Sequence, residues 1–385
     1  MQTSNKVRSV YLDHAASTPV RAEVLNAMLP FYGELFGNPS SAHQWGRAAR
    51  AELEAARERV AGALGVKRGE VVFTSGGTEA DNIAILGHVG AGSPSVIACS
   101  AIEHKAVLSA VKAAAREGAV PIFIAVDGAG MIDMGALEQA LQQKPAVLAV
   151  MWVNNEVGTV QPIAKIAELC ARAGVALHTD AIQAFGKLPV RIVEGITTLA
   201  VSGHKIGAPK GIGVLYVRAG TQMHATRHGG AQERGIRPGT ENVAYAVGLS
   251  VAMELAAREQ ESEAERLQAL RTELELRLQH GIADLAVNGA GAERAPHILN
   301  VSLRGVEQDA LLVSLDMAGI AVSTASACQS GTAEPSHVLV AMGRGATDEA
   351  ALRLSLGRTT TREDVSYVAE KLPEIVGRIR QLQKA

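Results

Sequence analysis

The chain has 385 residues, of which 47% are apolar, and its formal net charge is −2. This length predicts two or three domains, and the apolar share is ample for a large buried core. Charges of both signs are spread along the chain, which argues against nucleic acid or an anionic membrane as a partner. The N-terminal residues show no secretory signal and no apolar run is long enough to span a membrane, so we expect a cytoplasmic protein.

Three cysteines lie at positions 99, 170 and 328 and form no CxxC pair. Their number and spacing argue against a disulfide framework and against a zinc site. Cys99 and Cys170 lie in apolar segments and are expected to be buried packing residues. Cys328 lies instead in the stretch STASACQSGTAEPS, residues 323–336, whose small residues cannot fill a core. Taken alone, this stretch is explained as a flexible surface loop with an incidental thiol.

Helical and strand patterns alternate along the first two thirds of the chain. Helices are expected at residues 46–65, 76–89, 103–118, 133–143 and 163–174. Strands are expected at residues 70–75, 95–100, 120–126, 146–153, 175–180, 197–202 and 211–217. Apolar strands separated by helices predict an α/β fold with a mostly parallel sheet that is covered on both faces.

The pattern changes near residue 253, where a long charged helix is expected over residues 253–280. Its leucines recur at steps of three and four residues and predict one buried stripe, rather than a coiled coil, at Leu267, Leu270, Leu274 and Leu278. Further strands are expected at 297–303, 320–324 and 351–357, and helices at 308–319 and from Glu363 onward. We therefore expect a large domain over residues 13–253 and a smaller α/β domain formed by residues 1–12 and 254–385, which carries the loop at about 323–334.

Polar side chains follow five of the expected strands. Open parallel sheets bind ligands at the carboxyl ends of their strands, so these positions are candidates for a site. They are Thr74 to Thr78, Glu103 with His104, Asn154 to Glu156, Asp180 with Gln183, and Ser202 to Lys205. Each has an ordinary structural explanation when taken alone, such as a helix cap for His104 or Asp180 and a surface position for Lys205.

Taken together, these residues suit pyridoxal 5′-phosphate. The Ser-Gly-Gly-Thr turn offers backbone N–H groups at the positive end of a helix, which suits a phosphate, and it lacks the spacing of a dinucleotide fingerprint. A lysine such as Lys205 can form a Schiff base with an aldehyde. A carboxylate such as Asp180 can pair with a protonated pyridine nitrogen, and a ring such as that of His104 can cover the pyridine face.

Longer motifs reveal a resemblance to a known family. In order, the chain contains YLDHAASTPV, FGNPSSAH, FTSGGTEADNIAI, EHKAV, VNNEVGTVQPI, HTDAIQAFGK, SGHKIGAPKGIGVLYV, GGAQERGIRPGTENV, HILNVS, SACQSG and RLSLGR. It resembles the cysteine desulfurases, pyridoxal-phosphate enzymes of the class V aminotransferase group, and most of all the branch that supplies sulfur for iron–sulfur clusters. The resemblance covers almost the whole chain from Tyr11 and implies the pyridoxal-phosphate-dependent transferase fold of type I.

The resemblance implies roles for the candidate cofactor residues. Lys205 would form the Schiff base, and His104 would stack on the ring and act in acid–base steps. Asp180 would hold the pyridinium N–H, and Gln183 would bond the phenolic oxygen. The phosphate side of the site would be formed by Gly77, Thr78, Ser202 and His204. Thr240 would reach the phosphate of the neighbouring subunit, which implies a homodimer.

The resemblance also implies the substrate and the reaction. Arg353 would grip the carboxylate of L-cysteine with a two-pronged hydrogen bond. Asn155 would sit near both the cofactor and the substrate, and Asn38 would line the same pocket. L-cysteine would become L-alanine, and its sulfur would pass as a persulfide to Cys328. The attacking group must be a thiolate, which needs a polar, accessible setting, and the persulfide it forms is reversible.

Several questions remain open from the sequence. The sulfur acceptor could be an iron–sulfur scaffold protein, with Cys328 as a transient iron–sulfur ligand through its persulfide, or an enzyme that thiolates transfer RNA. Alternative functions are a selenocysteine lyase, a related class V aminotransferase, and a non-catalytic binding subunit. Cys328 argues against an aminotransferase, which needs no nucleophile there. The joint presence of Lys205, Asp180 and Arg353 argues against a binding subunit.

Overall fold

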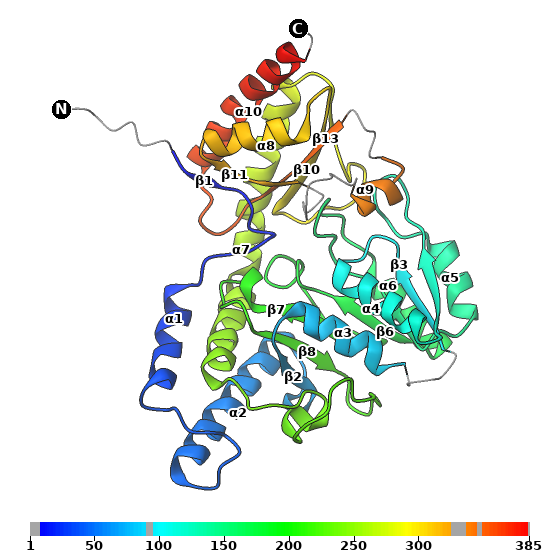
Figure 1. The fold of residues 1–385 in the computed structure, drawn as a ribbon, viewed down its shortest axis with the longest axis vertical. Helices are drawn as coiled ribbons and strands as arrows, with labels where there is room; N and C mark the ends of the chain where they lie inside the picture. Colours follow the sequence, from blue (N-terminus) through cyan, green and yellow to red (C-terminus); the bar gives the residue numbers. More distant parts are fainter. Residues whose placement is uncertain (1–7, 90–94, 325–335, 345–348, 384–385) are drawn as a thin grey trace, which may run out of the picture.

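A seven-stranded sheet forms the centre of the larger part of the molecule in the computed structural model, which describes residues 8–89, 95–324, 336–344 and 349–383 (Figure 1). The strand order is β2-β8-β7-β6-β5-β3-β4. Strand β8 runs in the opposite direction to the other six strands. The mostly parallel α/β sheet is therefore confirmed. The strands are β2 (Val71–Thr74), β3 (Val96–Ser100), β4 (Val120–Ile124), β5 (Val147–Ala149), β6 (Ala176–Asp180), β7 (Ile196–Ser202) and β8 (Gly213–Val217).

Helices accompany this sheet, and all except α1, which the sequence pattern did not predict, follow the expected boundaries within a few residues. They are α1 (Ala22–Met28), α2 (Gln44–Leu64), α3 (Gly77–Gly87), α4 (Lys105–Arg116), α5 (Met134–Gln142) and α6 (Ile163–Ala173). Helix α2 ends at Gly65, whose φ of 68° is the left-handed conformation that glycine adopts most readily. The expected strand at 146–153 is shorter in the structure. Its pairing with β3 ends at Ala149, and Met151 then donates its N–H to the carboxylate of Glu103 instead.

Helix α7 (Val243–Gly281) is 39 residues long and runs from the larger part of the molecule into the smaller one (Figure 1). It begins ten residues before the expected start, where the Asn242 side chain accepts the N–H of Tyr245. The expected leucine stripe is buried. The first half of α7 packs in the hydrophobic cluster that contains Met253. The second half, which carries the leucine stripe from Leu267 onward, packs in another cluster. The predicted domain boundary at 253/254 falls inside this continuous helix, and the domain limits stay a prediction.

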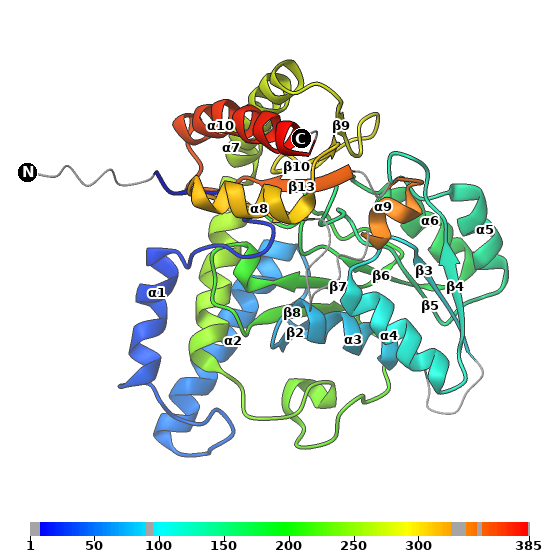
Figure 2. The same cartoon turned by 45° about the horizontal axis from the view of Figure 1, so that its top comes forward.

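The smaller part contains an antiparallel sheet of order β12-β13-β10-β9, with helices α8 (Gln308–Met317) and α10 (Arg362–Leu382) beside it (Figure 2). Its strands are β9 (Leu285–Val287), β10 (Ile298–Arg304), β12 (Ser323–Thr324) and β13 (Glu349–Ser355). The expected strand at 320–324 divides into β11 (Ile320–Ala321) and β12, because β11 pairs with the N-terminal strand β1 (Val10–Tyr11) rather than with β13. A short helix, α9 (His337–Ala341), follows the segment that contains Cys328.

The structure bears on the sequence expectations about cysteines, membrane spans and metal sites. Cys99 and Cys170 are fully buried in apolar surroundings, as predicted. In the described parts of the chain, no helix combines the length and the apolar character that crossing a membrane requires. Those same parts hold no group of three or more His, Cys, Asp or Glu side chains that could bind a metal ion.

Candidate active site

The carboxyl ends of five strands meet at one edge of the large sheet. Strands β2 and β7 are both antiparallel to β8, so β2 runs in the same direction as β7. Strands β3, β5 and β6 share that direction through their parallel pairing. The polar residues that follow these strands therefore lie along a common edge, beneath the smaller part of the molecule (Figure 2).

The turn between β2 and α3 forms a cradle beside the end of β7. Gly76 has a φ of 148°, a conformation that favours glycine. A Cβ atom on Gly77 would collide with Ile182 and would lie 3.5 Å from Cβ of Ser202. No side chain of the N-cap residue occupies the first turn of α3, so its N–H groups, including that of the exposed Thr78, are free of a capping side chain. This arrangement suits a phosphate that also contacts the Ser202 hydroxyl.

His204 lies two residues beyond Ser202 in the short helix η3 (Gly203–Lys205). Burial, followed by the positive charge of Lys205, lowers the pKa of His204 to about 4. The ring is therefore neutral at physiological pH and carries one N–H. Its Nδ1 atom is buried and has no hydrogen-bond partner among the described residues. An unpartnered polar atom at this position fits a ligand that accepts or donates a hydrogen bond there.

The side chain of Lys205 points at the N-terminal segment of the chain. Its Nζ atom donates to the carbonyl oxygens of Ala15 at 2.6 Å and Ala16 at 2.7 Å. Burial, followed by the charge of Arg353, lowers the pKa of Lys205 to about 8. Because the ammonium form is disfavoured, a useful fraction of the amine is neutral and nucleophilic near neutral pH.

Asp180 ends β6 and is affected by the charge of a second buried acid, Asp81. Its Oδ1 atom accepts the N–H of Ile182 at 2.8 Å. Burial, followed by the charge of Asp81, raises the pKa of Asp180 to about 8. His178, also on β6, has its Nε2 atom 3.2 Å from Oδ1 of Asp81. A carboxyl group in this environment gains stability when a cationic group pairs with it, which suits a protonated pyridine nitrogen.

Gln183 and Lys205 share a backbone acceptor. The Nε2 atom of Gln183 donates to the Ala15 carbonyl at 2.9 Å, and its Oε1 atom lies 3.1 Å from Nε2 of His297. We call residues 12–17 the strap. The strap is fixed to β13, because Ser355 donates its N–H to the Leu12 carbonyl at 2.7 Å and accepts the N–H of Ala15 on its hydroxyl at 2.9 Å.

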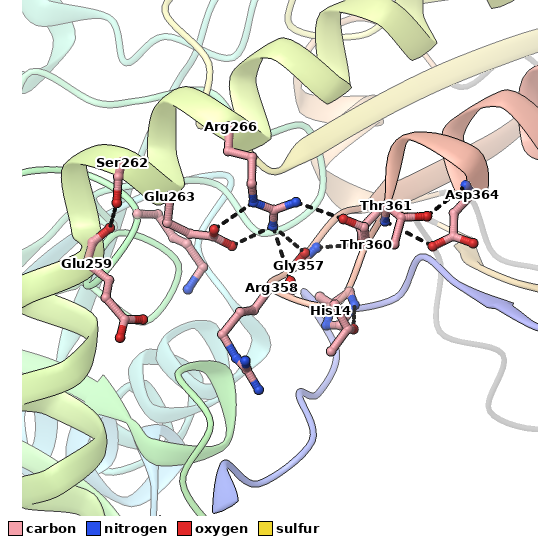
Figure 3. A network of polar contacts seen from close by, with 12 residues as sticks. His14, Glu259, Ser262, Glu263, Arg266, Gly357, Arg358, Thr360, Thr361 and Asp364 are labelled. Atoms are coloured by element: carbon pink, nitrogen blue, oxygen red, sulfur yellow. Dashed lines mark hydrogen bonds and ion pairs between the residues drawn. The ribbon is translucent and has the colours of Figure 1, made fainter. Parts of the chain in front are cut away.

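A polar network next to the strap holds the turn after β13 in place (Figure 3). Arg266, on α7, donates to the carbonyl oxygens of Thr360 at 2.7 Å and Gly357 at 3.0 Å. It also forms two hydrogen bonds of 2.8 Å with the carboxylate of Glu263. A Cβ atom on Gly357 would collide with the ring of His14. The turn after β13 therefore fits closely against the strap only because residue 357 is glycine.

His104 caps α4, where its Nδ1 atom accepts the N–H of Ala106 at 3.1 Å. The residue is exposed at the protein surface. Desolvation of its ring, followed by the charge of Lys205, lowers the pKa of His104 to about 4. The capping explanation for His104 is therefore confirmed, and the neutral ring remains available to a cofactor.

Arg353, on β13, is only 7% exposed. Its guanidinium donates to the carbonyl of Asn155 at 2.9 Å and to the carboxylate of Asp13 at 2.8 Å. Its Nε atom is buried and has no partner among the described residues. The arginine is thus already oriented by two acceptors and keeps donor capacity for a further carboxylate.

Two described residues, one on either side of the segment that carries Cys328, connect to this arginine or to the neighbour of its acceptor Asn155. Ser323 of β12 is paired with Arg353 of β13. At the other end, the hydroxyl of Ser336 donates to the carboxylate of Glu156, the neighbour of Asn155. Burial raises the pKa of Glu156 to about 7. Cys328 itself lies outside the described residues, so its predicted roles as nucleophile and as an iron–sulfur ligand stay predictions.

Asn38 and Thr240 are not brought to Lys205 within one chain. Asn38 lies between the short helix η1 (Leu29–Tyr32) and α2, where its side chain accepts the N–H of Ser40 at 2.9 Å. Figure 1 shows this connection at the end of α1 remote from the strap. Thr240 is exposed in the segment before α7. Their proposed roles stay predictions.

Sequence reasoning missed the strap carbonyls and His297. The motif YLDHAASTPV marked the strap as noteworthy, but the groups that hold Lys205 there are backbone carbonyls of two alanines, which leave no side-chain signal. His297 lies in the quoted motif HILNVS, yet only the folded structure places it against Gln183, 114 residues away in the chain.

Comparisons with known proteins agree with this geometry. Residues 10–368 match the family described as aminotransferase class-V. The chain is 42% identical to a cysteine desulfurase IscS from Dictyoglomus turgidum over 379 residues, which cover 97% of this chain and 96% of that protein. A solved NifS-like protein superimposes with a TM-score of 0.89 at 34% identity, covering 96% of this chain and all of the other. The structure described as SspA in complex with cysteine superimposes with a TM-score of 0.77 at 33% identity over 90% of this chain and 99% of the other.

Proposed function

The chain belongs to the class-V aminotransferase family and, within it, to the cysteine desulfurases, and from this premise we propose how its own residues carry out the reaction. The observation that carries the proposal is the environment of Lys205. Its amine has a pKa lowered to about 8 and lies at the sheet edge that also presents Asp180 and the Gly76–Gly77 cradle.

We propose that pyridoxal 5′-phosphate is the cofactor. The N–H groups of the cradle, the Ser202 hydroxyl and the unpartnered Nδ1 of His204 support binding of its phosphate. The buried Asp180 supports pairing with its ring nitrogen, and His104 supports contact with its ring. When bound, this cofactor supplies an aldehyde for amines and a ring that accepts electrons.

The protein residues bind the substrate and move its protons. Arg353 orients the amino-acid carboxylate through its remaining donors, while Asp13 and the Asn155 carbonyl hold the guanidinium in place. The lowered pKa of Lys205 lets its amine accept a proton from the substrate and return it, with the strap carbonyls as the resting partners of the amine. Burial raises the pKa of Asp180 to about 8, so pairing with a cationic ring nitrogen would favour its ionised form, which then balances that charge.

Cys328 is the proposed sulfur acceptor. The C–S bond of L-cysteine breaks, an S–S bond to Cys328 forms, and the carbon skeleton leaves as L-alanine, so that one cysteine and one thiol give one alanine and one persulfide. Two observations support this assignment: the described residues on either side of the segment, Ser323 and Ser336, lie against Arg353 and beside Asn155. A carrier protein for sulfur, such as an iron–sulfur scaffold, is the proposed partner.

We also propose that the protein acts as a homodimer. Exposed aromatic side chains on η1 and around the start of α2 support this, because Tyr32 is 61%, Phe36 69% and Trp45 58% exposed. Thr240 is exposed as well and is free to reach a second copy of the chain.

The proposed chemistry is tested with purified protein, pyridoxal 5′-phosphate, L-cysteine and a reductant. The loaded wild-type protein should be yellow and should release alanine and sulfide in equal amounts. Lys205→Ala should lose both the visible band and the activity. Cys328→Ser should keep the band and the affinity for cysteine but release no sulfide. A visible band that persists in Lys205→Ala would contradict the assignment of the lysine.

A further inference from the structure

His297 connects the smaller part of the molecule to the candidate site. It precedes β10, is 1% exposed, and reaches Gln183 across the boundary between the two sheets. Its Nε2 atom lies 3.1 Å from Oε1 of Gln183. This contact joins it to a side chain that shares its backbone acceptor with Lys205.

The hydrogen-bond pattern fixes the tautomer of His297. The Ala15 carbonyl can only accept, so the amide nitrogen of Gln183 must face it, at 2.9 Å. The amide oxygen must then face His297, and because this oxygen can only accept, Nε2 of His297 must carry the hydrogen. The other ring nitrogen, Nδ1, is buried without a partner in the described part of the chain, as expected for an unprotonated atom. Burial, then the charges of Lys187 and Arg271, hold the pKa of His297 well below its usual range, so the ring stays neutral.

A packing role alone does not account for this arrangement. Packing would be served by an apolar side chain of similar size, and a buried imidazole with one unpartnered nitrogen is costly. The hydrogen bond that offsets part of this cost is made to Gln183 alone among the described residues.

We propose that His297 is a positioning residue, whose Nε2–H holds the Gln183 amide with its nitrogen toward the strap and Lys205. One N–H of that nitrogen is donated to Ala15, and the second is left for an acceptor atom of the ligand. This inference rests on the proposed function, in which that acceptor is the phenolic oxygen of pyridoxal 5′-phosphate. His297 thereby controls how strongly the site stabilises negative charge on that oxygen, without touching the cofactor.

The expected effect is a change in the pH dependence of the visible absorption of the loaded protein. Donation by Gln183 favours the form of the chromophore that has lost its proton, so it lowers the pH at which the band changes. Without the His297 hydrogen bond, the Ala15 carbonyl alone fixes the amide, which can then tilt and donates less well to the ligand. The pH midpoint of the absorption change should then rise by about 0.5–1 pH unit, the size expected for partial loss of one hydrogen bond.

The test compares His297→Leu with His297→Gln in the loaded full-length protein. Leucine has a similar size but no donor, whereas glutamine places an amide nitrogen about where Nε2 of histidine lies. His297→Leu should raise the midpoint, and His297→Gln should keep it close to that of the wild type. In a Gln183→Leu background, His297→Leu should add no further rise. Equal midpoints for wild type and His297→Leu, equal shifts for the leucine and glutamine variants, or additive shifts in the double variant would each overturn the inference.

If His297→Leu does not fold, His297→Asn takes its place. The shorter amide of asparagine ends near the position of Nδ1 and cannot reach Gln183, so its midpoint should rise as predicted for leucine, and an unchanged midpoint would overturn the inference. The proposed function fails separately: it is contradicted if wild-type protein binds no pyridoxal phosphate, whereas an unchanged midpoint in normally loaded variants contradicts only the role of His297.

Discussion

At Lys205, the decisive property is the protonation state of a buried amine. Its pKa of about 8 results first from burial and then from the charge of Arg353. An ammonium group cannot attack an aldehyde. The rate at which cofactor-free protein combines with pyridoxal 5′-phosphate should therefore increase as the pH rises through about 8. Stopped-flow absorbance measures this rate, and a rate that is flat or falls over this range would show that another group limits the reaction.

Arg353 should be sensitive even to replacement by lysine. Lysine keeps the charge but cannot hold Asp13, the Asn155 carbonyl and a substrate carboxylate with one planar group. Arg353→Lys should lower kcat/KM for L-cysteine by about 10- to 100-fold, mainly through KM. Arg362→Lys is the matched control, because Arg362 pairs with Glu273 at the surface and is 76% exposed. An unchanged KM in Arg353→Lys would remove this arginine from the substrate pocket.

Sequence reasoning located the strand-end residues because parallel strands bring their carboxyl ends together, whatever the details of packing. Asp180, Ser202 and Lys205 needed only that rule to be placed at one edge. The position of the strap could not be predicted from this rule. Its alanines act through carbonyl groups that every residue has, and their contact with Lys205 spans 190 and 189 residues of the chain.

At the scale of elements, the turn after β13 and the strap depend on each other through Gly357. In Gly357→Ala the new methyl group would overlap the His14 ring and push the strap away from Lys205. We expect a loss of about 1–3 kcal/mol in the free energy of unfolding, the usual cost of overpacking. Gly377→Ala is the control, since a Cβ there, within α10, meets no atom within 4 Å. Urea unfolding measures the free energy of unfolding of both variants. A Gly357→Ala variant as stable as the wild type would show that the strap can move without cost.

The differences between expected and observed elements have physical causes. Residues 243–252 are almost entirely apolar, so they show no polar face and no helical periodicity. They form the start of α7 nevertheless, because α1 and α2 both pack against this helix and bury it on more than one side. The division of 320–324 between β11 and β12 depends on the pairing of β1, which is remote in sequence and leaves no local pattern.

At the scale of the whole molecule, the proposed homodimer predicts which surface controls assembly. Phe36→Glu should shift the protein from twice the mass of one chain toward the monomer in analytical ultracentrifugation, because it places a charge among exposed aromatic side chains. Met317→Glu is the control: Met317, at the end of α8, is 78% exposed and lies in the smaller part of the molecule. A dimer that tolerates Phe36→Glu, or a wild-type monomer, would contradict this assignment of the interface.

The fold class needed only the alternation of apolar strands and helices, which is repeated along most of the chain. The way the two sheets are joined was harder to foresee. Helix α7 crosses from one hydrophobic cluster to the other without a break, and the strap returns from the smaller sheet to the site. Both depend on contacts between distant segments.

We propose that sulfur from L-cysteine passes to Cys328 while the carbon skeleton leaves as alanine. Mass spectrometry of the loaded protein after brief exposure to L-cysteine without reductant detects this transfer. We expect one added sulfur atom on the peptide that contains Cys328, in proportion to the alanine formed, and none in Lys205→Ala. Alanine formation with no added sulfur on that peptide, or added sulfur on Cys99 or Cys170 instead, would contradict it.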